Sequence, residues 1–263
     1  MSARRFTVFL AATAAATLLV SCSSSDSGAE GKGGVPLVKK GKLVNCTGLP
    51  YKPFEHKEGK EVVGFDVDLV DLVAKKLGVE QEIVDTPFEG IESGEDLNSK
   101  KCDLAAAGMT ITDERKQKLD FSAPYFDATQ ALLTKKGSGY ATLADLKGKK
   151  LGVQQSTTGE KYAKDNGPGV TLQQYEDLGL ELAGLETGSV DAAINDNGVL
   201  YDYVKDHPDL EVTAEFQTGE QYGIGIRKGN AELLKAVNDV IAAAKADGTY
   251  DEIYKKWFGT APK

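Results

Sequence analysis

The stretch Gly108–Arg115 (GMTITDER) places an arginine directly behind two threonines. Thr112 can cap a helix that begins at Asp113, which puts Arg115 in the first turn of that helix. A helix N-terminus favours carboxylates over cations, because the helix dipole is positive there. A guanidinium in this position therefore indicates a further role, and the first one to consider is binding of an anion.

The chemistry around Arg115 suits a carboxylate. Its guanidinium is a planar fork of donors that matches a carboxylate in geometry. Thr110 adds a hydroxyl, and the backbone at Gly108 allows close approach because it carries no side chain. The alternative interpretation is a surface salt bridge between Arg115 and Glu114 or Asp120.

A second polar loop, 155–160 (QSTTGE), follows an expected strand over 149–154. Thr157 and Glu160 have the spacing of a capping box, which predicts a helix start. The backbone amides of 157–159 would then point out of a helix N-terminus, a place where anions bind. The two loops together could hold one carboxylate from both sides.

A third candidate is Asp196, which follows the expected strand 192–195. A carboxylate only accepts hydrogen bonds, so Asp196 could hold an ammonium group, or alternatively cap the next helix. Among the loop aromatics we expect Tyr51 and Phe88 to line a cleft and Phe54 to pack in the core. An anion site, a cation site and an aromatic wall together suit a zwitterion such as a free amino acid.

The elements that must position these residues alternate between strands and helices, which predicts parallel sheets with helices on both faces. The expected strands are 42–46, 81–84, 103–107, 131–134, 149–154, 192–195 and 222–226. The expected helices are 64–78, one after 157, 178–187, 200–205, 230–246 and 250–258. The pattern restarts near Leu151, so we expect two similar α/β lobes. Open α/β sheets bind ligands at the carboxyl ends of their strands, where both polar loops lie.

The composition is that of an ordinary globular protein. The chain has 263 residues, of which 41% are hydrophobic and 27% charged, enough for one large domain or two modest ones. The net charge of −9 becomes −11 without Arg4 and Arg5. Such an acidic chain argues against a nucleic-acid partner, which would require a basic surface.

The N-terminus has the features of an export signal. Arg4 and Arg5 precede the apolar run 6–20, which is too short for a comfortable membrane span. The run ends in LVSC, which resembles the lipobox of bacterial lipoproteins and implies lipidation at Cys22. We predict a signal peptide over 1–21; an ordinary signal peptide cut nearby and an uncleaved anchor are the alternatives. Residues 22–34 contain no large apolar residue and are predicted to form a flexible tether.

The other two cysteines, Cys46 and Cys102, lie in an exported chain, where disulfides persist. We favour a bridge between them over two buried thiols. CxxC and Cys/His metal spacings are absent from the sequence, and the only histidines are His56 and His207. We therefore expect no metal site and no cofactor.

Longer stretches give the chain a family resemblance that spans 42–262. The sequence resembles the polar amino-acid-binding proteins of bacterial ABC importers (solute-binding protein family 3), and within them the glutamine-binding proteins most. The motifs that carry the resemblance are YKPFE (51–55), VGFDVDLV (63–70), AGMTITDERK (107–116), FSAPYF (121–126), DLKGKKLGVQQSTTGE (145–160), QYGIGIRKGN (221–230) and DGTYDEIYKKWFGTAPK (247–263).

The resemblance implies the type II periplasmic-binding-protein fold, with two Rossmann-like lobes joined by two crossover strands. The first lobe would be discontinuous, built from 35–125 and 223–263, and the second would be 130–217. The hinges would be 126–129 and 218–222. Ligand would bind in the cleft, and the lobes would then close on it.

The resemblance also implies a set of ligand-binding residues. The set is Tyr51, Phe88, Gly108, Thr110, Arg115, Gln154, Thr158, Asn195, Asp196 and Tyr222, the last of them at the second hinge. In the family pattern, Arg115 corresponds to the arginine on the ligand carboxylate and Asp196 to the aspartate on the ammonium. Thr158 corresponds to the position whose amide meets the carboxylate. Phe88 and Tyr51 correspond to the aromatics beside the ligand.

Three positions depart from the glutamine-binding pattern. Gly48, Gln154 and Asn195 stand where that pattern has an aspartate, a lysine and a histidine. Without an acid at Gly48, a basic side chain has no obvious counter-charge, so we expect neutral polar ligands to rank above arginine, lysine and histidine. The amides of Gln154 and Asn195 could bind a glutamine-like side chain, whereas glutamate would need a cation.

The function that follows is capture of a free polar amino acid by a monomeric, lipid-anchored protein outside the cytoplasmic membrane. Its further partners would be an ABC permease and, through it, an ATPase. Two alternatives stay open: a ligand sensor for a membrane receptor, and a dehydratase-like enzyme on the same fold. Catalysis requires a positioned acid or base, and neither His56 nor His207 lies in the ligand loops, so we expect no enzyme activity.

Overall fold

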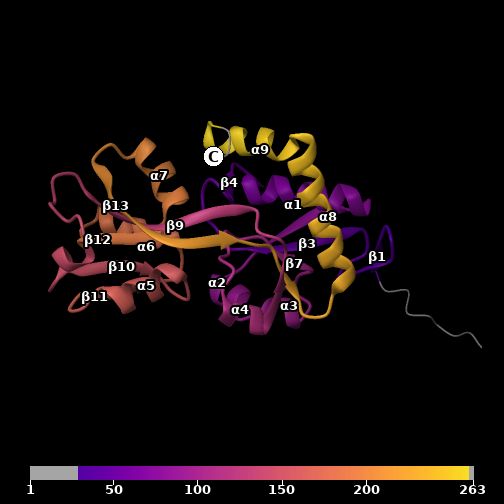
Figure 1. Ribbon diagram of the computed structural model, residues 1–263, viewed down its shortest axis with the longest axis horizontal. Helices are drawn as coiled ribbons and strands as arrows, with labels where there is room; N and C mark the ends of the chain where they lie inside the picture. Colours follow the sequence, from indigo (N-terminus) through magenta and orange to yellow (C-terminus); the bar gives the residue numbers. More distant parts are fainter. Residues whose placement is uncertain (1–28, 261–263) are drawn as a thin grey trace, which may run out of the picture.

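The computed structural model describes residues 29–260 and shows two α/β lobes side by side along the long axis (Figure 1). Each lobe is built on a five-stranded sheet. The first sheet has the order β6-β3-β7-β14-β8, from strands Glu80–Asp85, Lys42–Thr47, Leu104–Ala105, Gly225–Arg227 and Leu119–Phe121. The second has the order β11-β10-β12-β9-β13, from Thr171–Tyr175, Lys150–Gln154, Ala192–Asp196, Phe126–Lys135 and Leu210–Tyr222.

The first lobe follows the pattern expected from its sequence. β3 is buried along nearly its whole length and pairs in parallel with β6 and β7. Helix α1 (Phe65–Leu77) buries one apolar stripe and ends at Gly78, whose φ of 69° is the left-handed conformation that glycine adopts readily. Short helices α2 (Phe88–Glu92), α3 (Glu95–Asn98) and α4 (Asp113–Lys118) complete this lobe (Figure 1).

The second lobe repeats the strand–loop–helix arrangement. β10 pairs in parallel with β11 and β12, and the helices α5 (Thr158–Asn166), α6 (Leu178–Glu186) and α7 (Asn197–Asp206) follow strands β10, β11 and β12 in turn. A 3-10 turn, Leu143–Leu146, precedes β10. The carboxyl ends of these parallel strands lie at the edge of the sheet that faces the first lobe (Figure 1).

Both sheets are mixed, which corrects the expectation of purely parallel sheets. Strands β9 and β13 are antiparallel to their neighbours and run from one lobe toward the other (Figure 1). The strand expected over 222–226 is divided: β13 ends at Tyr222 and β14 begins at Gly225. The division occurs because the chain passes here from one sheet to the other.

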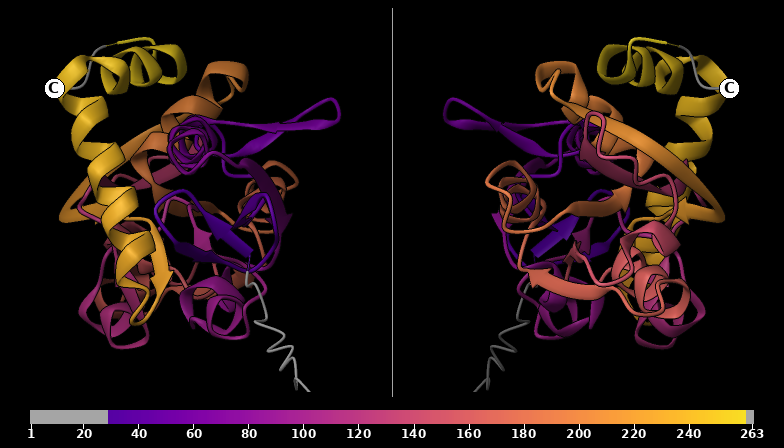
Figure 2. Two further views of the ribbon diagram at one scale, coloured as in Figure 1. Left: turned by 90° about the vertical axis from the view of Figure 1, so that its right-hand side faces the viewer. Right: turned by 90° about the vertical axis from the view of Figure 1, so that its left-hand side faces the viewer.

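The C-terminal helices α8 (Ala231–Asp247) and α9 (Thr249–Phe258) pack beside α1, so the first lobe contains both ends of the described chain (Figures 1 and 2). Phe258 of α9 joins a cluster of aromatic rings with Phe54, Phe65 and Phe126. Phe126 is the first residue of β9, so this cluster packs the start of a crossover strand against the first lobe. The sequence prediction of Phe54 as a core residue agrees with its full burial.

The tether predicted over 22–34 does not extend to residue 34. β1 (Ala29–Gly31) pairs with β2 (Val35–Leu37) in a small hairpin. Gly31 packs closely against Leu77, because it has no side chain; an added Cβ would come within 3.2 Å of the Leu77 side chain. The Lys32 amide donates to the Leu77 carbonyl. The stretch lacks large apolar side chains, but its backbone docks on the end of α1. A second hairpin is formed by β4 (His56–Glu58) and β5 (Glu61–Val63).

Other sequence expectations concern the ends and the cysteines. The signal peptide over 1–21 and Cys22 lie outside the described residues. Within 29–260, no helix has the length and apolar character needed to cross a membrane. Cys46 and Cys102 are joined by a disulfide, with Cα atoms 5.7 Å apart.

Candidate functional site

A small cavity lies between the lobes, at the carboxyl ends of strands from both sheets. Its wall is formed by Gly48, Tyr51, Phe88, Ala107, Gly108, Thr110 and Arg115 of the first lobe and by Gln154, Thr157, Thr158 and Asp196 of the second. The space measures about 20 Å³ in this closed arrangement, room for roughly one water molecule. A larger occupant would require the lobes to separate or the wall to move.

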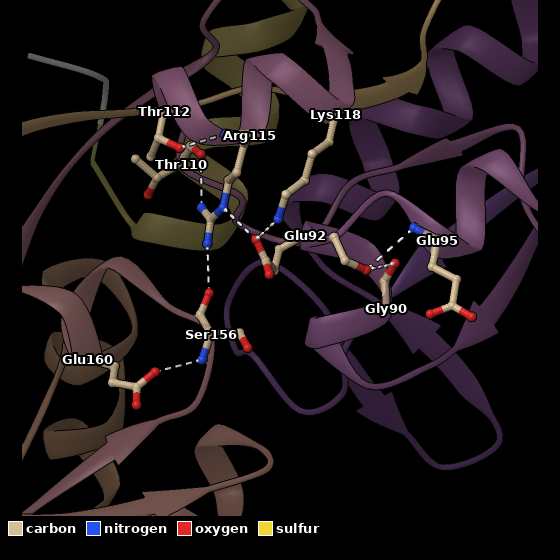
Figure 3. Close-up of polar contacts among 10 residues, drawn as sticks. Gly90, Glu92, Glu95, Thr110, Thr112, Arg115, Lys118, Ser156 and Glu160 are labelled. Atoms are coloured by element: carbon tan, nitrogen blue, oxygen red, sulfur yellow. Dashed lines mark hydrogen bonds and ion pairs between the residues drawn. The ribbon is translucent and has the colours of Figure 1, made fainter.

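Arg115 is the cation of this wall. Its side chain is buried, with its Nη1 donating to the carbonyl of Thr110 at 2.9 Å and its Nη2 donating to the carbonyl of Ser156 at 3.0 Å (Figure 3). The Ser156 bond crosses from the first lobe to the second. The guanidinium also lies 5.1 Å from the centre of the Phe88 ring. Arg115 is thus a buried cleft residue, and the alternative of a surface salt bridge with Glu114 or Asp120 does not describe it.

The helix that carries Arg115 begins as expected, because the Thr112 hydroxyl accepts from the Arg115 amide. Burial lowers the pKa of Arg115, and the nearby carboxylate of Glu92 opposes that shift. Glu92 lies 3.8 Å from Arg115 Nε and is shared with Lys118 at 3.5 Å (Figure 3). An arginine guanidinium stays charged in proteins. Each of its two terminal nitrogens carries two hydrogens, and the bonds to the Thr110 and Ser156 carbonyls use one hydrogen on each, so one hydrogen remains on each nitrogen.

Asp196 is the anion of the wall, and neutral donors surround it. The Tyr51 hydroxyl lies 2.9 Å from its Oδ2, and the Tyr222 hydroxyl and the Gln130 amide donate to its two oxygens. Its side chain makes no helix-capping hydrogen bond, so the alternative of a simple cap for α7 does not account for it. Among the described residues, no basic side chain lies within 4.0 Å of Asp196.

The pKa of Asp196 is raised to about 7. Burial is the main cause, the charge of Glu220 adds to it, and the hydrogen bonds from Tyr222, Tyr51 and Gln130 oppose it. These donors solvate the carboxylate without neutralising it. An ammonium group placed here would supply the charge that the protein does not.

Gly108 and Tyr51 fit one another closely. Gly108 has a φ of 53°, and an added Cβ would lie 2.6 Å from Tyr51 Cε1. The Gly108 amide donates to buried Asp66 at 2.9 Å, which also accepts from the Tyr125 hydroxyl at 2.7 Å. Asp66 thereby holds the turn at Gly108, and the glycine lets the Tyr51 ring reach Asp196 across the cleft.

The second lobe contributes the start of α5 and the end of β10. The Thr157 hydroxyl accepts from the Glu160 amide, as expected for a cap, while Glu160 itself accepts from the Ser156 amide at 2.9 Å (Figure 3). Thr158 is the first residue of the helix, so its amide lies at the positive end of the dipole. Gln154 ends β10, and its buried Oε1 has no hydrogen-bond partner among the described residues.

The structure brings together eight of the ten residues predicted for the site. Those that line the cavity are Tyr51, Phe88, Gly108, Thr110, Arg115, Gln154, Thr158 and Asp196. Asn195 and Tyr222 do not line it. Asn195 directs its Oδ1 toward Tyr51 and donates to Glu181 at 2.9 Å, and the hydroxyl of fully buried Tyr222 donates to Asp196.

Two polar residues at this site were missed from the sequence. Gln130 of β9 and Glu220 of β13 come from the crossover strands, outside the loops that carry the motifs. The Glu220 carboxylate accepts from Thr110 at 3.1 Å, Thr158 at 3.0 Å and Gln130 at 3.0 Å, so it contacts both lobes. Strand periodicity could have identified Glu220 from the sequence. It is two residues from Tyr222, so both side chains lie on the same face of the strand.

The arrangement suits one small zwitterion. Arg115 and the α5 N-terminus favour a carboxylate, and Asp196 favours an ammonium. No histidine or cysteine is among the residues that line the cavity. Within 29–260, no group of three or more His, Cys, Asp or Glu side chains is placed to hold a metal ion.

Comparison with known proteins defines the class. The profile of the bacterial extracellular solute-binding proteins, family 3, matches residues 43–260, and the chain belongs to this family. It is 41% identical over 222 residues to the L-cystine-binding protein TcyJ of Escherichia coli (strain K12), covering 82% of each chain. An ancestral arginine-binding protein bound to glutamine superposes with a TM-score of 0.80 at 44% identity, covering 84% of this chain and 99% of that one. A further structure, the ancestral amino acid-binding protein AncCDT-1, a precursor of cyclohexadienyl dehydratase, gives a TM-score of 0.76 at 38% identity, over 83% and 95% of the two chains. The relatives of this chain are amino-acid-binding proteins, several of them named for ABC transporters. The chain is therefore a member of the extracellular solute-binding proteins, and the type II periplasmic-binding-protein fold is confirmed.

Proposed function

We propose that this protein captures a free polar amino acid between its lobes and delivers it to the permease of an ABC importer. The observation that carries the proposal is the pair Arg115 and Asp196. Both are buried in the wall of one interlobe cavity, and neither is neutralised by a tight ion pair with the protein. Buried charges are stable when paired, and the two head groups of an amino acid complete both pairs at once.

The residues proposed to hold the ligand divide by role. Arg115, Thr110 and the Thr158 amide bind the carboxylate, and Asp196 binds the ammonium. Tyr51 and Phe88 flank the ligand side chain. Gly108 leaves space for the Tyr51 ring because it has no side chain. Asn195 orients Tyr51, and Tyr222 orients Asp196, each through a hydrogen bond.

A glutamine-like ligand is favoured by Gln154. Its buried Oε1 lacks a donor among the described residues, and a side-chain amide would supply one. A glutamate side chain would instead bring a second acceptor.

Lobe closure is proposed to occur about the crossover strands, at 126–129 and 218–222. These segments pair with each other in the β9–β13 ladder, next to a bulge between Phe216 and Glu220. The moving bodies would be 35–125 with 223–263, and 130–217. Small-angle X-ray scattering should show a smaller radius of gyration with ligand than without, and an unchanged radius would contradict closure.

The protein is further proposed to be a monomer, held at the outer face of the cytoplasmic membrane by a lipid on Cys22. The LVSC motif supports this anchor. Labelling cells with a fatty-acid analogue should mark the wild type, and Cys22→Ser should remove the label. Equal labelling of both proteins would assign the lipid elsewhere.

The test of the main proposal is a thermal-shift screen of the chain from Ser23 onward against the twenty amino acids. A ligand that binds only the folded state adds about 2.7 kcal/mol at a hundredfold excess over its Kd. A shift with one or a few polar amino acids is expected. No shift with any of them would refute amino-acid capture and favour the sensor reading with another ligand.

A dehydratase-like enzyme is the second candidate, because Asp196 has a pKa of about 7 inside a cavity, as a general acid or base would. The similarity to a dehydratase precursor points the same way. NMR of each ligand after prolonged incubation distinguishes the two, since a binding protein returns its ligand unchanged.

A further inference from the structure

Glu220 is a charged residue behind the cavity wall to which the proposed function gives no role. It belongs to β13, within the proposed hinge segment 218–222, is half-buried and does not line the cavity. Its Oε2 accepts from the Thr110 hydroxyl at 3.1 Å, the Thr158 hydroxyl at 3.0 Å and the Gln130 amide at 3.0 Å. Within residues 29–260, no basic side chain forms a salt bridge with this carboxylate. Among these residues, neutral donors alone therefore hold its charge in place.

The three donors come from three separate elements. Thr110 lies between β7 and α4 in the first lobe, Gln130 lies in the crossover strand β9, and Thr158 begins α5 in the second lobe. Thr110 and Thr158 are on opposite sides of the cleft, so one oxygen atom can bind both hydroxyls only when the lobes are together. The contacts of Glu220 therefore stabilise the closed form specifically.

Glu220 also sets the direction of two hydroxyl hydrogens. A threonine hydroxyl has one hydrogen, whereas an ionised carboxylate can only accept. The hydrogens of Thr110 and Thr158 therefore point at Glu220, and the hydroxyl lone pairs remain for the cavity that both residues line. A ligand then meets two oriented acceptors instead of two freely rotating hydroxyls, which lowers the entropy cost of binding.

Gln130 connects Glu220 with Asp196. The Gln130 amide nitrogen has two hydrogens, and it donates to Asp196 and, at 3.0 Å, to Glu220. Both neighbours are acceptors, so the opposite orientation of the amide would place oxygen against oxygen. Gly159 allows Gln130 to approach α5, because an added Cβ would lie 2.7 Å from Gln130 Oε1. Glu220 is thereby linked to both charged ends of the site.

We propose that Glu220 is a positioning residue for ligand binding: its carboxylate orients the Thr110 and Thr158 hydroxyls and ties the two lobes together in the closed form. This inference rests on the proposed function, in which the same cavity holds a free amino acid. Glu220 acts from behind the wall, through residues that touch the ligand.

The rival role for Glu220 is electrostatic. Burial lowers the pKa of Arg115, and the charge of Glu220 is among those that oppose this shift. An anion that interacts with Arg115 in this way would compete with the ligand carboxylate. The two roles predict opposite results when the charge is removed, since loss of a positioning residue weakens binding and loss of a competing anion strengthens it.

Glu220→Gln keeps the size of the side chain and removes its charge. Hydrogen bonds to a charged group are stronger than bonds to a neutral one, so the Kd should rise about 5- to 30-fold. The assay is calorimetric titration of the chain from Ser23 onward with the one of the twenty amino acids that gives the largest thermal shift. Glu215→Gln is the charge-matched control, because Glu215 is exposed on the same strand outside the cavity wall, and it should keep the wild-type Kd.

A double-mutant cycle tests whether Glu220 acts through the hydroxyls. Thr158→Val removes one hydroxyl and keeps the backbone amide. In this background, the factor by which Glu220→Gln raises the Kd should be smaller by about threefold or more. Thr158→Ser keeps the hydroxyl and should preserve the full effect of Glu220→Gln. A residue with a merely structural role would give the same factor in both backgrounds.

An unchanged Kd in Glu220→Gln would overturn the positioning role and leave amino-acid capture intact. A lower Kd would also overturn it and would assign Glu220 the electrostatic role. Equal effects of Glu220→Gln in the Thr158→Val and Thr158→Ser backgrounds would exclude action through this hydroxyl. Failure of the wild type to bind any of the twenty amino acids would refute both this inference and the proposed function.

Discussion

Replacing Arg115 with alanine tests the carboxylate grip directly. The guanidinium uses one hydrogen on Nη1 and one on Nη2 for the carbonyls of Thr110 and Ser156. One hydrogen remains on each terminal nitrogen, which is the pair that a carboxylate needs for bidentate binding. Loss of one partner from a buried charge pair costs about 3 to 5 kcal/mol, so Kd should rise roughly 150- to 5,000-fold.

The fold should tolerate Arg115→Ala. The variant loses two hydrogen bonds to carbonyls, worth about 1 kcal/mol each, so Tm should fall by roughly 4 to 8 °C in a protein of this size. Arg115→Lys keeps the charge without the planar fork and should bind with intermediate affinity. Lys116→Ala is the matched control, since Lys116 is exposed and its one ion pair within residues 29–260 is with Asp113, three residues earlier in the same helix.

The assay is calorimetric titration with the amino acid that gives the largest thermal shift. If Arg115→Ala binds that ligand within threefold of the wild type while its Tm is nearly normal, the carboxylate assignment is wrong. If Lys116→Ala loses affinity as strongly as Arg115→Ala, the effect reflects the general charge of the helix rather than the fork.

Three further predictions concern the anion, the pH and the disulfide. Asp196→Asn should weaken binding by roughly 10- to 100-fold, through loss of a charged hydrogen bond, and titration at pH 8 showing retained affinity would demote Asp196 to a neutral support. The pKa values of Asp66 and Asp196 are raised to about 7, so the folded ligand-free protein holds protons that the unfolded chain releases above about pH 4. That stabilisation is lost as pH rises through 7, so Tm measured by calorimetry should fall between pH 5.5 and pH 8.5. The fall should be smaller in Asp196→Asn. An equal fall in the variant and the wild type would exclude Asp196 as a source of the pH dependence. Replacing both Cys46 and Cys102 by serine opens a loop with a sequence separation of 56 and should cost up to about 4 kcal/mol of unfolding free energy, whereas an unchanged denaturant midpoint would mean that the bridge adds no stability.

The two charged ends of the site could be predicted because each follows a local rule. Thr112 marks the helix start that holds Arg115, and Asp196 is the last residue of the short strand β12. In an open α/β sheet, such positions fall at the same edge, so strand ends far apart in sequence converge. The two-lobe α/β fold was predicted from the alternation of strands and helices, and the family from the resemblance of longer motifs; both are confirmed.

Other features depend on pairings that local patterns do not reveal. Gln130 reaches Asp196 because β9 lies antiparallel to β12, which places these residues opposite each other in the ladder. Glu220 joins them from β13, whose register contains a bulge. The hairpin at Ala29–Gly31 has no apolar periodicity and forms by backbone contact with the end of α1.

The polar contacts across the cleft explain why head-group binding and closure should be coupled. Tyr51 of the first lobe contacts Asp196 of the second, Arg115 contacts Ser156, and Glu220 of the crossover strand contacts both Thr110 and Thr158. Each of these contacts places a charged group against neutral partners. Closure by the protein alone therefore leaves Asp196 without a basic partner among the described residues, and leaves Arg115 with the carboxylate of Glu92, 3.8 Å from its Nε, as a loose counter-charge. A zwitterion between Arg115 and Asp196 removes that penalty only when both lobes reach it. The ligand then favours the closed state over the open state by the free energy of the contacts that it makes only when the lobes are closed. A permease specific for the closed form would therefore recognise the ligand-bound protein.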